Sequence, residues 1–334
     1  MALSPTWIRP RPEGIHLPGP DVWIDPARPV ARAIVTHGHA DHARAGHGAV
    51  WASAETLAIM AARGQAPEAG HALAMGVAIG LGDVTVSLHP SGHILGACQV
   101  RLEGPDGRVV VVTGDWKRAP DPTCAPFTPL PCDILVTEAT FALPVFRHPP
   151  PEAEVARALA MLGRQPRRCL LIGAYALGKA QRLVRLLRAA GHERPIFLHG
   201  ALKALCALYE ARGVALGPLV PVAEATKADL AGEIVLAPPS ALADRWSRRL
   251  PDPIPAMASG WMRIRARARQ RGVELPLVIS DHADWAELTA TIAELAPREV
   301  WVTHGRDDAL VHWCRTQGIP ARALELVGRE DEDD

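Results

Sequence analysis

The feature that most constrains this chain is a hexapeptide with four ionisable side chains, placed directly after an apolar segment. It reads H-x-H-x-D-H over residues 37–42. Imidazole and carboxylate groups are the ligands that zinc takes where thiolates are absent. On an extended strand His37 and His39 point the same way, because side chains alternate with a period of two. We expect Asp41 and His42 to follow at a turn where a helix begins, so the hexapeptide suits two metal ions side by side.

Further side chains of the same chemistry stand just after strand-like runs: His93, Asp115, His282 and His304. The ends of strands are where α/β proteins collect functional groups, because the sheet holds the backbone rigid while loops present the side chains. A single His or Asp in such a place is more often structural, so each residue carries little weight alone. Together with the hexapeptide they supply enough ligands for two metals.

The composition describes a chain that can bury a full core and has no overall charge. It has 334 residues, 48% of them hydrophobic, with 36 basic and 36 acidic side chains. A zero net charge gives no overall positive field that would indicate nucleic-acid binding, although a local basic groove can exist in a neutral protein. No apolar run approaches the ~18 residues that span a bilayer, and the N-terminus lacks the apolar core of a signal peptide. We therefore expect a cytoplasmic protein without a membrane segment.

The pattern of strand-like and helical segments changes near residue 145. Residues from about 20 to 140 are rich in strand-like runs, whereas strands and helices alternate afterwards, which predicts a parallel sheet. An apolar run over 277–280 is expected to form one of the late strands. The last residues, 327–334, end in an acidic run that we expect to be disordered.

The order H-x-H-x-D-H, then Gly-His, then Thr-Gly-Asp resembles the metallo-β-lactamase fold superfamily. Other segments are similar to its nucleic-acid-processing branch, the β-CASP nucleases: S-G-H-I-L-G-A at 91–97, E-A-T-F at 138–141, A-L-G-K-A-Q at 176–181, S-D-H-A at 280–283 and V-T-H-G at 302–305. The resemblance runs from Asp25 to Gly305. It implies an α/β (α+β) fold, an αββα sandwich with a compact inserted α/β domain. The sandwich would comprise 1–140 and 274–326, and the insertion 141–273.

The resemblance also implies roles for these side chains. His37, His39 and His93 would hold a first zinc ion. Asp41, His42 and His304 would hold a second, Asp115 would bridge the pair, and Asp25 would orient a ligand imidazole. Two Zn²⁺ ions are expected, and Mn²⁺ can occupy such sites too.

The chemistry of such a pair fits phosphodiester hydrolysis. Two metals about 3.5–4 Å apart can generate a bridging hydroxide that attacks phosphorus. The leaving alkoxide needs a proton, and His282 would donate it with Glu138 as its orienting partner. His282, Glu138 and Asp41 are the candidate catalytic residues.

A phosphate contact is expected at the start of a helix in the insertion. Gly178 and Lys179 could meet a backbone phosphate through free N–H groups and the ammonium. An ordinary glycine beside a solvated lysine explains the same pair equally well.

The size and motif context most closely resemble the bacterial DNA ligase-associated exonucleases. That resemblance implies a metal-dependent DNA exonuclease in DNA repair, with an ATP-dependent DNA ligase and a helicase as functional neighbours. An RNA-processing nuclease of the same branch fits the same metal site, because no residue can be assigned to reading the 2′-hydroxyl. A small-molecule metallo-hydrolase and a non-enzymatic scaffold are further alternatives. Polarity, exonuclease or endonuclease mode and oligomeric state are left open.

Overall fold

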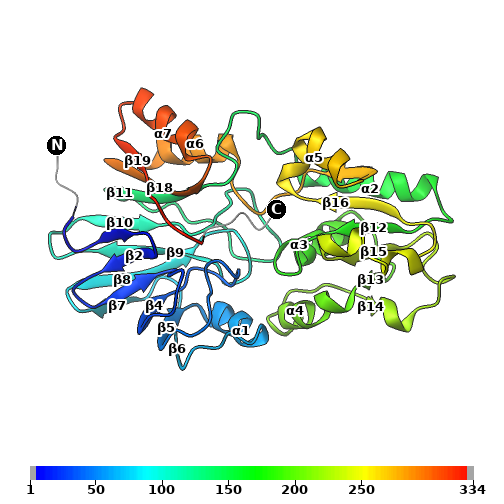
Figure 1. The fold of residues 1–334 in the computed structure, drawn as a ribbon, viewed down its shortest axis with the longest axis horizontal. Coiled ribbons are helices and arrows are strands. Elements are labelled where there is room, and N and C mark those ends of the chain that lie inside the picture. The colour runs from blue at the N-terminus through cyan, green and yellow to red at the C-terminus, as the bar shows by residue number, and fades with distance from the viewer. Residues whose placement is uncertain (1–4, 329–334) are drawn as a thin grey trace. The chain divides into compact units, whose positions relative to one another are not determined.

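The computed structural model describes residues 5–328, which divide into two compact units (Figure 1). The first unit contains residues 5–147 and 282–328, and the second, inserted unit contains residues 148–281. The sequence placed these boundaries at 140/141 and 273/274, whereas the structure divides at 147/148 and 281/282. Most of the acidic tail predicted to be disordered, from residue 329 on, lies outside the described residues.

Two local pairings explain why the boundaries move. Residues 141–147 stay with the first unit, because the carbonyl of Phe146 accepts a hydrogen bond from the Trp285 N–H at 3.2 Å. At the return, β17 (Leu275–Leu277) pairs in parallel with β16 (Ile254–Ala258) and so belongs to the inserted sheet. Of the strand expected over 277–280, only Leu277 lies in a strand, because the next N–H, that of Val278, donates to a Glu154 carboxylate oxygen instead of to a neighbouring strand.

Two mixed sheets form the first unit. One has the strand order β1-β2-β3-β4-β5-β6 and the other the order β19-β18-β11-β10-β9-β8-β7. Their bounds are β1 (Arg9–Arg11), β2 (Gly14–Leu17), β3 (Val22–Ile24), β4 (Arg32–Ile34), β5 (Ala49–Ala52), β6 (Ala69–Ala72), β7 (Ala78–Leu81), β8 (Val84–Pro90), β9 (Cys98–Glu103), β10 (Val109–Val112), β11 (Ile134–Ala139), β18 (Glu299–Gly305) and β19 (Ala321–Ala323).

Three apolar layers hold this unit together. The largest lies between the sheets, where residues such as Ile24 and Ile34 of the first sheet pack with Val86 and Val112 of the second. A second layer joins the other face of the second sheet to α6 (Trp285–Leu295) and α7 (Asp307–Thr316). A third joins the first sheet to α1 (Ala54–Ala62). The result is an α/β sandwich with helices outside both sheets (Figure 1).

The inserted unit is a parallel α/β domain. Its six strands run in the order β14-β13-β15-β12-β16-β17, and every pairing is parallel. An α-helix precedes each of β12, β13, β14 and β17, as crossover connections between parallel strands favour, whereas the β14–β15 and β15–β16 connections contain only short 3-10 helices. The remaining bounds are α2 (Pro151–Arg164), β12 (Leu170–Gly173), α3 (Lys179–Ala189), β13 (Ile196–Leu198), α4 (Gly200–Ala211), β14 (Leu219–Pro221), β15 (Ile234–Ala237) and α5 (Arg265–Gln270). Within residues 5–328 no helix combines the length and apolar character needed to cross a bilayer.

The start of α6 is fixed by a capping box beside the first unit's functional residues. The Asp284 carboxylate accepts the N–H groups of Ala286 and Glu287 at 2.9 and 3.0 Å. The Glu287 carboxylate in turn accepts the Asp284 N–H at 3.2 Å. This reciprocal pairing satisfies N–H groups that a helix start leaves unpaired. It therefore holds the backbone two residues after His282 in a defined place.

Candidate metal centre

Seven His and Asp side chains from separate strand ends converge in the first unit. His37 and His39 follow β4, His93 follows β8, Asp115 follows β10, and His304 lies in β18. Ligand atoms of His37, His39, His93 and Asp115 all lie within 4.8 Å of one another. The same holds for His42, Asp115 and His304, and for His37, Asp41 and His42. The structure thus brings together all the side chains that the sequence suggested as metal ligands.

The Asp115 carboxylate is placed between the two sets of imidazoles. Its Oδ2 lies 3.3 Å from His37 Nε2 and 3.7 Å from His93 Nε2. Its Oδ1 lies 3.4 Å from His42 Nε2 and 3.5 Å from His304 Nε2. One oxygen therefore faces each set, which is the arrangement that a carboxylate bridging two cations requires.

The other ring nitrogens are held by nearby oxygen atoms. Asp25 Oδ2 lies 2.8 Å from His42 Nδ1, Thr36 Oγ1 lies 3.0 Å from His37 Nδ1, and Thr303 Oγ1 lies 2.9 Å from His304 Nδ1. Contacts of this kind fix the tautomer and the ring orientation of metal-ligating histidines. Here they leave each Nε2 directed at Asp115.

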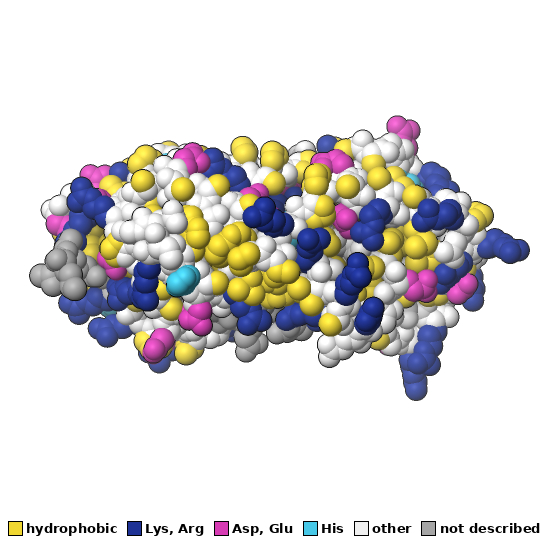
Figure 2. All heavy atoms as spheres, turned by 90° about the horizontal axis from the view of Figure 1, so that it is seen from above, with side chains coloured by type: hydrophobic (Ala, Val, Ile, Leu, Met, Phe, Trp, Pro, Cys, Tyr) yellow, Lys and Arg dark blue, Asp and Glu magenta, His cyan; other side chains and the backbone are white. Residues whose placement is uncertain are grey.

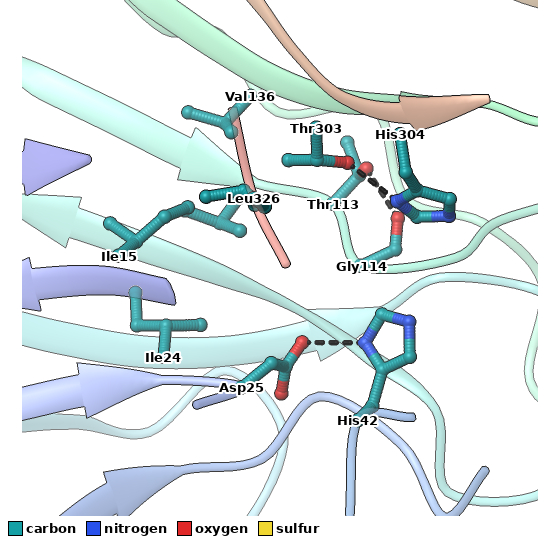
Figure 3. Close-up of a pocket in the computed structure, with 11 residues that line it drawn as sticks. Ile15, Ile24, Asp25, His42, Thr113, Gly114, Val136, Thr303, His304 and Leu326 are labelled. Carbon is teal, nitrogen blue, oxygen red and sulfur yellow. Dashed lines mark hydrogen bonds and ion pairs between the residues drawn. The ribbon is translucent and has the colours of Figure 1, made fainter. Parts of the chain in front are cut away.

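Asp25 is itself tightly held. Its Oδ1 accepts the Thr36 N–H and its Oδ2 accepts the Thr36 hydroxyl, both at 2.7 Å. The carboxylate is buried and thus connects the backbone of the hexapeptide loop to the ring of His42. Figure 3 shows His42 with Asp25, and His304 with Thr303, at a small cavity that Ile15 and Ile24 also line.

Burial and neighbouring charge set the protonation of the ligand atoms. Burial, followed by the His42 imidazole, lowers the pKa of His37 to about 4. Burial, followed by the His282 imidazole, also holds the pKa of His93 well below its ordinary value. Burial alone would raise the pKa of Asp115, but His42 and His37 hold it well below the usual range. Neutral imidazoles and an ionised carboxylate are the forms that bind metal ions.

Three polar atoms test whether the centre fits a cation. His37 Nε2, Asp41 Oδ1 and Asp115 Oδ1 are buried and make no hydrogen bond within the described part of the chain. Buried polar atoms in native proteins nearly always have a partner. These lone pairs lie in one cluster and belong to nitrogen and oxygen ligands that suit Zn²⁺ or Mn²⁺. The residues present therefore fit a pair of divalent cations.

A histidine–glutamate pair stands beside the metal centre. Both carboxylate oxygens of Glu138 lie 3.0 Å from His282 Nδ1. Glu138 is buried in β11 and also accepts the Trp116 N–H at 3.0 Å and the Thr140 hydroxyl. The His282 ring lies 4.7 Å from the His93 ring between centroids, and its side chain is 15% exposed. A ring held at Nδ1 and open to solvent in part can exchange a proton at Nε2.

Two glycines let the loops approach closely. Gly92 has φ +75°, and a Cβ there would lie 2.2 Å from the Lys117 carbonyl oxygen. Gly114 has φ +56°, and a Cβ there would lie 2.7 Å from Thr36 Oγ1. Both the left-handed backbone and the contact exclude a side chain. The residues before His93 and Asp115 are therefore glycine for a steric reason.

The hexapeptide does not lead into a helix as expected. The N–H of Ala43 donates to the His39 carbonyl at 2.7 Å, which closes one turn. The chain then reverses at Gly46, whose φ is +86°, and enters β5 at Ala49. The expected helix is wrong, because too few residues separate the turn from the next strand.

The suggested phosphate contact has other partners within the inserted unit. The Gly178 N–H donates to Gln181 Oε1 at 2.8 Å, so the expectation of a free N–H there is wrong. Lys179 is buried, and its Nζ lies 3.3 Å from Asp281 Oδ1 and 4.8 Å from the centre of the Tyr175 ring. A phosphate role for these two residues stays a prediction.

Sequence reasoning suggested Asp25 as a residue that orients a candidate ligand, and the structure places it 2.8 Å from His42 Nδ1, but two other positioning residues were missed. Thr36 and Thr303 each precede a ligand histidine, and their hydroxyls were not singled out. The adjacency itself was the signal, since a hydroxyl next to a ligand imidazole can hold its second nitrogen.

Comparison with known proteins adds to this geometry. The chain is 31% identical over 323 residues to a protein named probable DNA ligase from Opitutus terrae. This alignment covers 93% of this chain and 30% of that protein. It is 31% identical over 140 residues to transcription termination factor FttA of Thermococcus kodakarensis. That alignment covers 39% of this chain and 21% of FttA. No protein-family model matches.

The chain belongs to the β-CASP branch of the metallo-β-lactamase fold. A crystal structure of a protein of unknown function from Enterococcus faecalis agrees in fold, with a TM-score of 0.57 at 15% identity, over 87% of this chain and 78% of that chain. The expected α/β sandwich of this branch is confirmed. This β-CASP chain spans 30% and 21% of the two curated relatives' lengths, so their names describe larger proteins.

The metal content of ligand variants tests the centre. We expect the purified protein to carry about two divalent ions per chain, as a two-metal site requires. Replacing the shared carboxylate by Asp115→Ala should lower that content most, because both ions lose a ligand. Elemental analysis after gel filtration measures it, with the exposed His312→Ala as a matched control. Full metal content in Asp115→Ala would contradict the shared carboxylate.

Proposed function

We propose that this chain is a two-metal phosphodiesterase that acts on nucleic acid, and that its role is that of a DNA exonuclease in repair. The observation that carries the proposal is the Asp115 carboxylate shared by two imidazole sets, with the His282–Glu138 pair beside it. His37, His39 and His93 would hold one ion and Asp41, His42 and His304 the other. When bound, two divalent cations supply the Lewis-acid charge that activates water at neutral pH and offsets charge on a phosphodiester.

His282 would supply the proton that the leaving oxygen needs. Its Nδ1 faces Glu138, whose carboxylate would hold the N–H there and stabilise a doubly protonated ring. The proton would then pass from Nε2 to the alkoxide. The Trp116 N–H and the Thr140 hydroxyl keep Glu138 in place, so the carboxylate cannot turn away from the ring.

A basic surface in the inserted unit favours a polyanionic substrate. Five arginines alternate along residues 263–271, with no acidic residue among them. Arg263, Arg265 and Arg269 are exposed and form no ion pair within residues 5–328. Arg267 stacks over the Trp261 ring at 3.9 Å, which anchors the segment. Figure 2 shows Lys and Arg side chains gathered over this part of the inserted unit.

The choice of DNA rests on the relatives. The relative that aligns over most of this chain is named a probable DNA ligase. Removal of nucleotides from damaged ends precedes sealing, so an exonuclease and an ATP-dependent ligase would act in sequence, with a helicase exposing the strand. The setting would be the cytoplasm. An RNA substrate is the second candidate, because FttA, a transcription termination factor, is also similar.

The substrate is tested by single-turnover cleavage of end-labelled single-stranded DNA and a matched RNA, with Zn²⁺ or Mn²⁺. We expect stepwise shortening of DNA, from which the labelled end reveals polarity. Asp115→Ala should reduce the rate by at least ~10³, since the metal supplies most of the charge stabilisation. Preferential RNA cleavage would point to RNA processing, and no variant-sensitive cleavage of either would leave a small-molecule hydrolase.

The role of His282 is tested by changing the leaving group. His282→Ala should slow DNA cleavage by about 10²–10⁴. On bis(p-nitrophenyl) phosphate the loss should be only a few-fold, because p-nitrophenolate departs without a proton. Glu138→Gln should show the same pattern more weakly, with metal content unchanged in both variants. Equal losses on the two substrates would show that His282 does not act as the proton donor.

The basic surface is tested by the salt dependence of DNA binding. Arg265 and Arg269 lie one helical turn apart on α5, and each neutralised phosphate contributes about 0.7 to the slope for single strands. The double change Arg265→Gln/Arg269→Gln should make the negative slope of log K against log salt shallower by about 1.4. Fluorescence anisotropy of labelled single-stranded DNA measures binding, and the Asp115→Ala background is used so that the strand is not cleaved. Arg9→Gln/Arg11→Gln, the same charge change on exposed β1, should leave the slope unaltered.

A further inference from the structure

A second cavity lies wholly within the inserted unit and uses none of the metal ligands. Its volume is about 290 Å³. That size is close to the lower end of small-molecule sites, roughly 300–1,000 Å³. The residues that matter for its chemistry are Gly200, Lys227, Leu230, Trp246, Arg249 and Leu250.

The fold places this cavity where parallel sheets receive ligands. Gly200 begins α4 two residues after β13 ends, and Val222, another wall residue, directly follows β14. Both strands belong to the parallel sheet, so the two wall residues lie at carboxyl ends. Open α/β sheets bind ligands outside the carboxyl ends of their strands.

Two cations and no carboxylate line the cavity. Lys227 and Arg249 are exposed, and neither side chain forms an ion pair or hydrogen bond within residues 5–328. Asp229, two residues from Lys227, instead accepts the Thr226 N–H at 2.8 Å and the Thr226 hydroxyl at 2.7 Å. The positive end of α4, a helix of 12 residues, adds to the same field. The cavity therefore favours an anion.

An aromatic ring and an apolar floor occupy the rest of the wall. Trp246 is half-buried, and the His199 ring holds it edge-on, with centroids 4.6 Å apart and planes at 78°. Leu230 and Leu250 are buried in the apolar cluster beneath it. An indole over an apolar floor suits a planar ring, since bases stack on aromatic side chains without regard to sequence.

We propose that this cavity binds a nucleotide, with its phosphate at Lys227 and Arg249 and its base against Trp246. The two cations alone would suit any anion, but the indole and the apolar floor would make no favourable contact with inorganic phosphate. No bond is made or broken at this site. The proposed site is distinct from the hydrolytic centre, because it would bind the nucleotide without converting it.

Calorimetric titration of the full-length, metal-loaded protein tests the proposal with dAMP, deoxyadenosine and inorganic phosphate. We expect dAMP to bind more tightly than either fragment. Lys227→Gln and Arg249→Gln should each weaken dAMP about ten-fold, as loss of one charged hydrogen bond predicts. Trp246→Leu should weaken dAMP and leave phosphate unchanged.

Matched controls come from neighbouring residues. Arg248 and Lys203 are exposed but do not line the cavity, so Arg248→Gln and Lys203→Gln should leave dAMP binding unchanged. Asp115→Ala separates this cavity from the metal centre, because retained dAMP binding there excludes a phosphate held by the metals. Absence of dAMP binding, equal binding of phosphate, or indifference to the cavity variants would overturn the proposal.

Strand binding then distinguishes the source of the nucleotide. If the cavity variants also weaken a labelled single strand, the ligand is a nucleotide within the strand. If they weaken dAMP alone, the ligand is a free nucleotide. Cleavage measured on the same variants keeps this result separate from the hydrolytic proposal, which fails only if DNA and RNA both stay intact.

Discussion

The Asp115 carboxylate, buried between two sets of imidazoles, is the interaction on which the rest of the structure depends. Its Oδ2 faces His37 and its Oδ1 faces His42, within 3.3 and 3.4 Å. A buried carboxylate is costly unless it is paired. Four separate strand ends must therefore meet at one point, and they must present nitrogen atoms rather than ring carbons. Divalent cations would complete the pairing that the imidazoles begin.

Both sheets of the first unit contribute to this point. His37 and His42 belong to the loop after β4 in one sheet, whereas Asp115 follows β10 and His304 lies in β18 of the other. The apolar layer between the sheets sets their spacing, so the metal centre exists only when the sandwich is closed. Metal binding would then be coupled to folding of this unit, because the candidate ligands do not assemble in an unfolded chain.

Under the proposed function, chemistry and recognition would be divided between the two units. The first unit carries the candidate metal ligands and the His282–Glu138 pair, which fit a hydrolytic reaction. The inserted unit carries the arginine segment 263–271 and the cavity at Trp246, which fit phosphates and bases. A sandwich of this kind can hold many substrates, so the inserted unit is where selectivity for a polyanion would arise.

The sequence by itself determined the chemical nature of the centre, because ligand identity and spacing are local properties. The H-x-H-x-D-H hexapeptide could be read from side-chain alternation and turn residues alone. So could the four His and Asp residues after strand-like runs. The pairing of His282 with Glu138, 144 residues apart, was expected from the sequence, and the structure shows it. Only the tertiary structure decided how Asp115 divides its oxygens and that Lys179 pairs with Asp281. The unit boundaries and the Lys227–Trp246–Arg249 cavity also required it. These contacts join residues far apart in sequence, and their partners depend on strand order, which no local pattern encodes.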